Sequence, residues 1–561
     1  MTSWLESAMP ALAVAPIVLP LAAAATMIAL GERARAARTL VNLAASVAGL
    51  VVAIALVVHV DRGGAIAVYL PANWPVPYGI ALVVDRLSAL MLALGNLLGL
   101  SALLYATARW HRAGVHFHPL FQLQLMGLNG AFLTADLFNL FVFFEVMLAA
   151  SYGLLLHGSG VARVRAGLHY VAVNLLASAV FLVGVAMIYG VTGTLNLADI
   201  AQKLAAVPAA DRGLVHAGVA ILAIAFLTKA AMWPLGFWLV PAYAAASAPA
   251  AALFAVMTKV GVYAVLRCSS LFAAGDAAIG QFGGDVLVGG GCATLAVGAL
   301  GVLATQRLSR VAGACVAVSS GTLIAAVGFG EAPILAGALF YLVSSTLALA
   351  ALYLLVELGE RVHDVDTDQP EAEGGATGSL PFSFGELELP QGVNLDDEEH
   401  ALVGRAMPAA VVFLGLAYLA CALVIAGLPP LSGFLGKFTM LAAALDPAGL
   451  AMPARPRPGI QAWLFVALVI VSGLFATLAL ARTGMRQFWT SRDRPHPRLR
   501  VVECVAVALP LAACIALTVG AGPGFRYATA TADALRHPAR YIEAVLTAQP
   551  VHARAVTGGA R

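Results

Sequence analysis

Long apolar runs separated by short polar loops dominate the pattern of this 561-residue chain. A helix that spans a membrane needs about 20 largely apolar residues. Windows of this kind predict an all-α membrane protein with about fourteen transmembrane helices. They lie at residues 9–30, 40–60, 80–106, 118–134, 137–157, 166–190, 215–238, 247–271, 284–304, 311–330, 332–358, 405–428 continuing to 444, 460–481 and 500–521.

Proline interrupts two of these predicted helices. The seventh contains Pro234 shortly after Lys229, and the twelfth contains Pro429 and Pro430 shortly before Lys437. Because proline removes a backbone donor and clashes with the preceding turn, we expect both helices to be discontinuous. Paired interruptions in two halves of a chain indicate the functional site of a transporter. The lysine precedes one break and follows the other, which suggests two inverted repeats of five helices.

The composition agrees with a polytopic membrane protein. Hydrophobic residues make up 61% of the chain and charged residues only 11%, which leaves too little polar surface for a soluble protein of this size. The net charge of +3 gives no indication of nucleic-acid binding. The six cysteines stand singly, without a CxxC spacing, so the sequence predicts no metal centre and no cofactor.

Positive charge is distributed unevenly between the two sets of loops. Loops after odd-numbered helices hold seventeen arginines, and those on the other side hold seven basic residues, Arg267 among them. The positive-inside rule therefore predicts that both termini lie outside the cytoplasm. One cytoplasmic loop, residues 360–400, collects twelve acidic residues against one arginine and predicts a solvated insertion. It is either a plain surface loop or a docking site for a partner.

Four ionisable residues lie inside the apolar windows. Three of the four lysines in the chain, Lys229, Lys259 and Lys437, are there, together with Glu145. Arginine effectively cannot lose its proton, whereas a desolvated lysine can, so this choice of residue indicates proton handling. Facing lipid, the four would cost on the order of 10 kcal/mol. An inert Glu–Lys pair would also reduce that cost, but it leaves two lysines without an acidic partner.

Smaller polar side chains could complete a path between the lysines. Water held by Ser344, Ser345 and Thr346 could relay a proton, although serine and threonine in helices often bond only to their own backbone. His169, at the cytoplasmic end of the sixth predicted helix, is either a proton entry group or an ordinary boundary histidine.

Several stretches resemble the antiporter-like subunits that Mrp-type cation/proton antiporters share with the membrane arm of respiratory complex I. In order along the chain, they are 136–145, 189–196, 228–238, 258–263 and 427–437. Within this family the pattern is most similar to the D-type subunit of the Mrp, or Pha, antiporters of proteobacteria. The features that indicate this type are the stretch 428–437, the stretch 341–346 and the acidic loop that ends at His400.

The resemblance implies a fold and four functional residues. The fold has fourteen helices, two inverted five-helix bundles, and discontinuous seventh and twelfth helices. Glu145, Lys229, Lys259 and Lys437 match the family's proton-transfer positions, while Ser344 stands where many members carry histidine. The implied division of the chain is N-terminal helices 1–117, a first bundle 118–271, a second bundle 272–481 containing the acidic loop, and a last helix with its tail 482–561.

The function implied is that of a proton-translocating subunit of a multisubunit Na⁺ or K⁺/H⁺ antiporter in the cell inner membrane. It would be a transporter component, not an enzyme, and would work with other subunits. Two alternatives remain. The chain could serve a complex I-like NADH–quinone oxidoreductase, driven by redox chemistry elsewhere, or it could be a scaffold whose buried ion pairs are inert.

Overall fold

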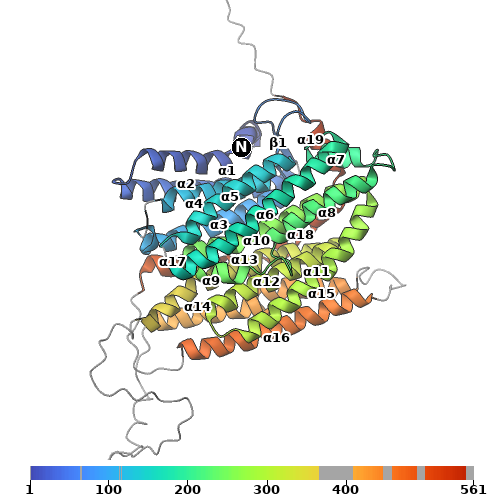
Figure 1. Cartoon of the computed structure of the whole chain (residues 1–561). Coiled ribbons are helices and arrows are strands. Elements are labelled where there is room, and N and C mark those ends of the chain that lie inside the picture. Colours follow the sequence, from blue (N-terminus) through green and yellow to red (C-terminus); the bar gives the residue numbers. More distant parts are fainter. Residues whose placement is uncertain are drawn as a thin grey trace, which may run out of the picture.

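A computed structural model describes residues 2–63, 66–112, 114, 116–158, 160–364, 409–446, 458–488 and 499–550. Helices make up almost all of this part, and they run side by side at a slant in Figure 1. The first half of the chain contains ten α-helices and the short 3-10 helix η1 (Trp110–Arg112). The α-helices are α1 (Thr2–Ala29), α2 (Arg35–Gly63), α3 (Arg86–Ala108), α4 (Phe117–Leu133), α5 (Leu137–Leu156), α6 (Val161–Thr192), α7 (Leu197–Leu204), α8 (Arg212–Lys229), α9 (Leu239–Ala245) and α10 (Ala248–Gly275).

The second half begins with three long helices and ends with two short ones. Of the acidic segment predicted at 360–400, only the end of α13 falls within the described residues. The helices are α11 (Ala277–Ala304), α12 (Leu308–Phe329), α13 (Ala332–Asp364), α14 (Ala409–Ala426), α15 (Ser432–Leu445), α16 (Ile460–Phe488), α17 (Val501–Val519), α18 (Ala521–Arg536) and α19 (Ala539–Leu546).

Thirteen helices in the described ranges are long and apolar enough to cross a membrane. The prediction of about fourteen differs by one because α4, at 17 residues, is just too short to count. Both discontinuous helices are confirmed. The predicted seventh helix is divided into α8 and α9, and the twelfth into α14 and the 14-residue α15.

A small hairpin was not predicted. Strands β1 (Ala67–Tyr69) and β2 (Leu82–Val84) pair antiparallel, with Val68 opposite Val83. The helix predicted from residue 80 was therefore wrong at its start, because residues 82–84 form strand β2. Helix α3 begins only at Arg86, because the Asp85 side chain accepts a hydrogen bond from Ser88 N and caps the helix. A three-residue strand inside an apolar window gives no periodicity from which to recognise it.

Helix α10 forms the centre of the molecule. Every residue from Ala248 to Cys268 is buried, and the helix packs against α3, α8, α12 and α13 among others. By contrast, α2 and α16 expose large apolar side chains such as Val51 and Ile470. A helix that faces lipid tails requires such a surface. Consequently, an ionisable residue in the middle of α10 is shielded from both water and lipid.

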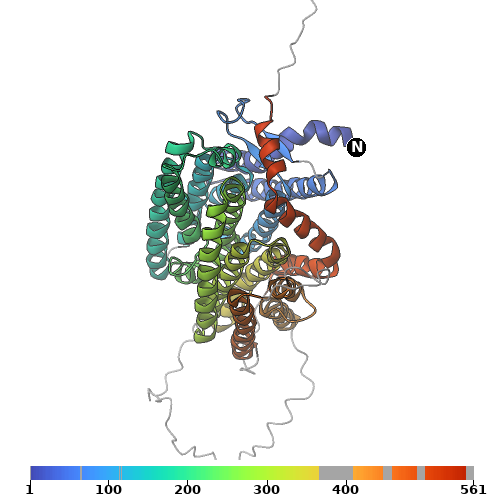
Figure 2. The ribbon, with the colours of Figure 1, turned by 90° about the vertical axis from the view of Figure 1, so that its right-hand side faces the viewer.

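The start of α1 and the last described helix, α19, lie at the same end of the molecule. Helix α19 lies near the labelled N-terminus in Figures 1 and 2, and it packs against α7 and β1. At the opposite end, arginine side chains join the helix termini. The guanidinium of Arg500 donates to Ala108 O, and Arg482 Nη2 donates to Thr305 O at 2.8 Å. These two contacts bring the ends of α3, α11 and α16 and the start of α17 together at this end.

Candidate functional site

Glu145 and Lys229 meet through a third side chain, Ser178 of α6. The Ser178 hydroxyl donates a hydrogen bond to Glu145 Oε1, while Lys229 Nζ donates to Ser178 Oγ at 3.5 Å. The described part of the chain has no direct ion pair between Glu145 and Lys229. The lysine ammonium also lies 5.2 Å from the centre of the Phe144 ring, an attractive cation–π position. The arrangement is a carboxylate and an amine joined by one hydroxyl.

The break between α8 and α9 follows Lys229 directly, and neighbouring helices satisfy its backbone. Ser320 of α12 donates to Ala230 O at 2.6 Å, and Thr294 of α11 accepts from Trp233 N at 2.8 Å. Ala231 has a positive φ of 58°, which a residue other than glycine rarely adopts. Non-helical backbone at membrane depth survives where protein bonds its polar groups. Here those groups come from helices of the second half of the chain.

Lys259 lies in the middle of α10 and has 0% of its surface exposed. Within the described residues, neither its Nζ nor Thr258 Oγ1 has a hydrogen-bond partner. A buried amine without a partner is costly as an ammonium, so it favours either the neutral form or a bound water molecule. Lys259 is thus suited to hold a proton only transiently.

Lys437 is held at the second break. Its Nζ donates to Ile425 O and Ala426 O, each at 3.0 Å, and these are the last carbonyls of α14. The final carbonyls of a helix have no partner within the helix, and they carry the negative end of its dipole. The discontinuity of the predicted twelfth helix therefore creates the acceptors that stabilise this ammonium.

A small cavity of about 10 Å³ adjoins Lys437 and is lined by Ser319, Tyr341 and Ser345 among others. Such a space is about large enough for one water molecule. Ser319 Oγ and Ser345 Oγ lie 3.0 Å apart, so the water would have hydroxyl partners on one side and the lysine on the other. Ser345, one of the predicted relay residues, is therefore well placed.

The other two predicted relay residues face elsewhere. Ser344 Oγ bonds to Ser432 Oγ at 2.7 Å, across from the cavity, and Thr346 Oγ1 donates to Leu342 O of its own helix at 2.6 Å. The structure thus brings Ser345, and not Ser344, next to Lys437. In a helix, consecutive residues point about 100° apart, and sequence alone could not tell which serine faces the lysine.

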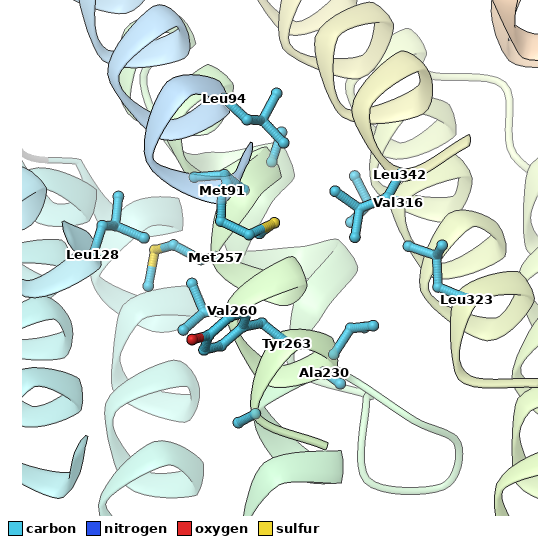
Figure 3. Close-up of a cluster of buried hydrophobic side chains, with 14 of the residues drawn as sticks. Met91, Leu94, Leu128, Ala230, Met257, Val260, Tyr263, Val316, Leu323 and Leu342 are labelled. Carbon is cyan, nitrogen blue, oxygen red and sulfur yellow. The ribbon is translucent and has the colours of Figure 1, made fainter. Parts of the chain in front are cut away.

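Apolar side chains fill the space around α10. Figure 3 shows Met257 of α10 beside Leu128 and Met91, and Val316 of α12 beside Leu342 of α13. All five are buried. Proton transfer between Lys259 and the Ser319–Ser345 pair would therefore need water to enter a packed apolar region.

His169 is exposed near the arginine-bearing end of α6. Its Nδ1 donates to Arg165 O at 3.0 Å. Among the described residues it makes no bond to Glu145, Lys229, Lys259 or Lys437. Pro234, Pro429 and Pro430 lie in the two breaks, as predicted.

Two polar clusters were not predicted. Arg267 was assigned to a loop, but it lies buried in α10, with its Nη2 2.7 Å from Asp85 Oδ2. At the other end, His157 Nε2 donates to Trp110 O at 2.9 Å. Burial, opposed by this hydrogen bond and aided by the nearby Arg163 charge, lowers the pKa of His157. Each cluster joins residues that are far apart in the chain, and a single sequence does not reveal such contacts.

Comparisons with known proteins agree with the fold and the site. Residues 134–371 match the family described as NADH:quinone oxidoreductase/Mrp antiporter, TM. The chain is 50% identical to a Rhizobium meliloti protein named as a probable K(+)/H(+) antiporter subunit of the D type, covering 98% of this chain and 99% of that protein. It is 30% identical to the D-type Na(+)/H(+) antiporter subunit of Alkalihalophilus pseudofirmus, covering 95% and 99%.

Two solved structures share the whole architecture. One chain of the Mrp complex from Dietzia sp. DQ12-45-1b superposes with a TM-score of 0.79 at 26% identity, covering 95% of this chain and 99% of that one. A chain of respiratory complex I from Thermus thermophilus gives 0.70 at 23% identity, covering 96% and 100%, which is a likeness of fold.

The chain therefore belongs to the family of antiporter-like membrane subunits shared by Mrp antiporters and NADH:quinone oxidoreductases. Within that family, the full-length relatives from Rhizobium, Alkalihalophilus and Bacillus subtilis are all named as D-type antiporter subunits.

Proposed function

We propose that this chain is the proton-translocating subunit of a multisubunit antiporter that exchanges Na⁺ or K⁺ for H⁺. The observation that carries this proposal is the buried Glu145–Ser178–Lys229 chain beside a broken helix. The 50% identity to a K⁺/H⁺ antiporter subunit over nearly the whole length supports it. The chain is then a component of a transporter that works with other subunits, and not an enzyme.

In this scheme Glu145 stabilises the protonated form of Lys229. When the hydrogen bonds through Ser178 break, Lys229 loses this stabilisation and releases its proton toward Lys259. Lys259 passes it through transient water to the Ser345 side, and Lys437 receives it beside the last carbonyls of α14. The inert-scaffold alternative gives no reason for Lys259 to be buried without a partner among the described residues.

The membrane and the orientation are further parts of the proposal. The bacterial relatives support a place in the cell inner membrane. The common end of α1 and α19, together with the arginine-bearing loops at the other end, supports both termini on the non-cytoplasmic side. The subunits of redox-driven complexes share the fold at only 21% and 23% identity, which does not favour a redox-driven role.

The inverted five-helix repeats also remain part of the proposal. In the first set α4 packs on α5 and α6 on α8, and in the second α11 packs on α12 and α13 on α15. In chain order α4, α5 and α6 correspond to α11, α12 and α13, while α8 and α15 are the lysine-bearing halves of the two broken helices. An odd number of membrane crossings places the second set in the opposite orientation.

The test is Lys229→Ala in the complete antiporter complex. We expect the variant to assemble but to lose proton movement on addition of Na⁺ or K⁺, measured with a pH-sensitive dye in everted membrane vesicles. Lys203→Ala is the matched control, because the Lys203 side chain is 41% exposed and, among the described residues, forms its ion pair with Asp199 of the same helix, α7. Full activity of Lys229→Ala would contradict the proposal, as would an equal loss in the control.

A further inference from the structure

A groove of about 730 Å³ opens at the arginine-bearing end of the molecule. It lies among the first turns of α6, the helix α9 and the first turn of α12, and α9 packs against both other helices. Figure 1 labels α9 and α12 next to each other. The charged and polar lining consists of Arg165, His169, Arg307, Ser309 and Arg310.

Among the described residues, no carboxylate neutralises the charge of this groove. None of the described residues that line it is aspartate or glutamate. Nor do the side chains of Arg165, Arg307 and Arg310 form an ion pair in the described part of the chain. The nearby Arg163 is different, since its Nε donates to Ala245 O at 2.9 Å and its guanidinium lies over the Trp110 ring. The groove thus offers three arginines to an external anion.

The rest of the groove is apolar and faces the side of the helix bundle. Phe237, Pro241 and Ala244 line it, and the Phe237 side chain is 65% exposed. Leu168 of α6, next in sequence to the lining residue His169, is also exposed at 69%. Exposed apolar side chains of this kind at the side of a membrane protein contact lipid tails. An occupant must therefore be anionic at one end and apolar along its length.

The two helix starts in the groove add to its preference for an anion. Helices α6 and α12 begin there, and neither Gly160 nor Arg307 at their N-caps makes a side-chain capping bond. Free amides and the positive ends of the helix dipoles then point toward the same region. They supplement the arginines, which supply the net charge.

We propose that this groove binds one anionic phospholipid, with its phosphate among Arg165, Arg307 and Arg310 and an acyl chain against Phe237. Basic grooves between helices at the cytoplasmic side suit such headgroups, and guanidinium groups bind phosphate oxygens in pairs. A protein partner would have to bring both an acidic group and an apolar ridge to the same place. The proposal is independent of the proton path.

The test measures lipid binding to the full-length chain in mild detergent. Fluorescent phosphatidylglycerol and phosphatidylcholine are titrated into the natural protein and into Arg165→Gln/Arg307→Gln/Arg310→Gln. We expect the natural protein to prefer phosphatidylglycerol, and the triple variant to lose its affinity by on the order of tenfold or more. A matched triple variant, Arg33→Gln/Arg35→Gln/Arg109→Gln, removes three arginines outside the groove and should bind normally.

Replacing the same three residues by lysine keeps the charge and separates binding from folding. That variant should retain most of the preference for phosphatidylglycerol. Unchanged binding by the glutamine variant would overturn the proposal, and so would equal binding of both lipids. Displacement of the lipid by inorganic phosphate at equal concentration would assign the groove to free phosphate. Loss of a co-purifying protein with unchanged lipid binding would assign it to a protein interface.

Discussion

Ser178 determines how Glu145 and Lys229 interact, because its hydroxyl lies between them. A hydroxyl can donate and accept at once, so it joins an acceptor carboxylate to a donor ammonium without requiring them to touch. A direct buried ion pair would hold its proton firmly. The bridged arrangement is weaker, because the lysine bond to Ser178 is long, at 3.5 Å. A weak bridge is easier to open, which suits a group that must release a proton.

Ser178→Ala tests the bridge. Hydrogen bonds to charged groups are worth about 1.5–3 kcal/mol, so we expect cation-dependent proton movement to fall by roughly tenfold or more. Ser178→Thr keeps the hydroxyl and should retain most of the activity. Both variants are measured in the same vesicle assay, with the amount of assembled complex determined in parallel. Normal activity in Ser178→Ala would show that water or direct contact replaces the bridge.

At the scale of elements, the two broken helices depend on close approach by neighbours. Gly261 of α10 packs on the break after α8, and a methyl group there would lie 2.4 Å from Ala230 N. Gly433, in the first turn of α15, packs instead on the other half of its own broken helix, where a methyl group would lie 1.9 Å from Val424 O of α14. Both distances are far shorter than contacts between real atoms. Glycine at position 261 lets α10 approach the break beside Lys229. Glycine at position 433 lets α15 pack closely on α14, whose last carbonyls bind Lys437.

Gly261→Ala should therefore disturb the first break. We expect a loss of roughly 1–3 kcal/mol in stability from overpacking, together with impaired proton movement, because the backbone beside Lys229 must shift. Gly289→Ala in α11 is the control, since a methyl group there meets nothing within 4 Å. Alanine should be neutral or slightly stabilising at that exposed helical site. Thermal unfolding in detergent compares the two, and equal stability of both variants would contradict the packing argument.

The elements also show how far sequence alone can predict this molecule. Apolar windows and Pro234, Pro429 and Pro430 were enough for the helices and for both breaks, because length and the missing proline donor act locally. The partners of the breaks were not predictable. Ser320 bonds to a carbonyl 90 residues away in sequence. Likewise, the choice between Ser344 and Ser345 depends on the rotation of α13, which only packing determines.

At the scale of the whole molecule, Arg267 connects three distant parts of the chain. It pairs with Asp85, which caps the start of α3, and its guanidinium lies 4.8 Å from the centre of the Tyr541 ring in α19. The central helix, the N-terminal helices and the C-terminal helices are thereby held at one end. The side chains of the pair are only 6% and 14% exposed, so water compensates little when one partner is lost.

Removing only Arg267 should lower the free energy of unfolding more than removing Arg267 and Asp85 together. Arg267→Gln alone leaves the Asp85 carboxylate buried without its cation, and we expect a loss of about 3 kcal/mol. Adding Asp85→Asn should recover part of it, because no uncompensated charge then remains. The Lys203–Asp199 pair is the control, because water reaches the Lys203 side chain, which is 41% exposed, so Lys203→Gln should lower the free energy of unfolding less than Arg267→Gln does. Chemical unfolding in detergent of the natural protein, Arg267→Gln, Asp85→Asn and the double variant completes the cycle. If the losses at Arg267 and Asp85 simply add, the pair does not couple α10 to α3, and direct packing between these helices and against α18 holds this end together.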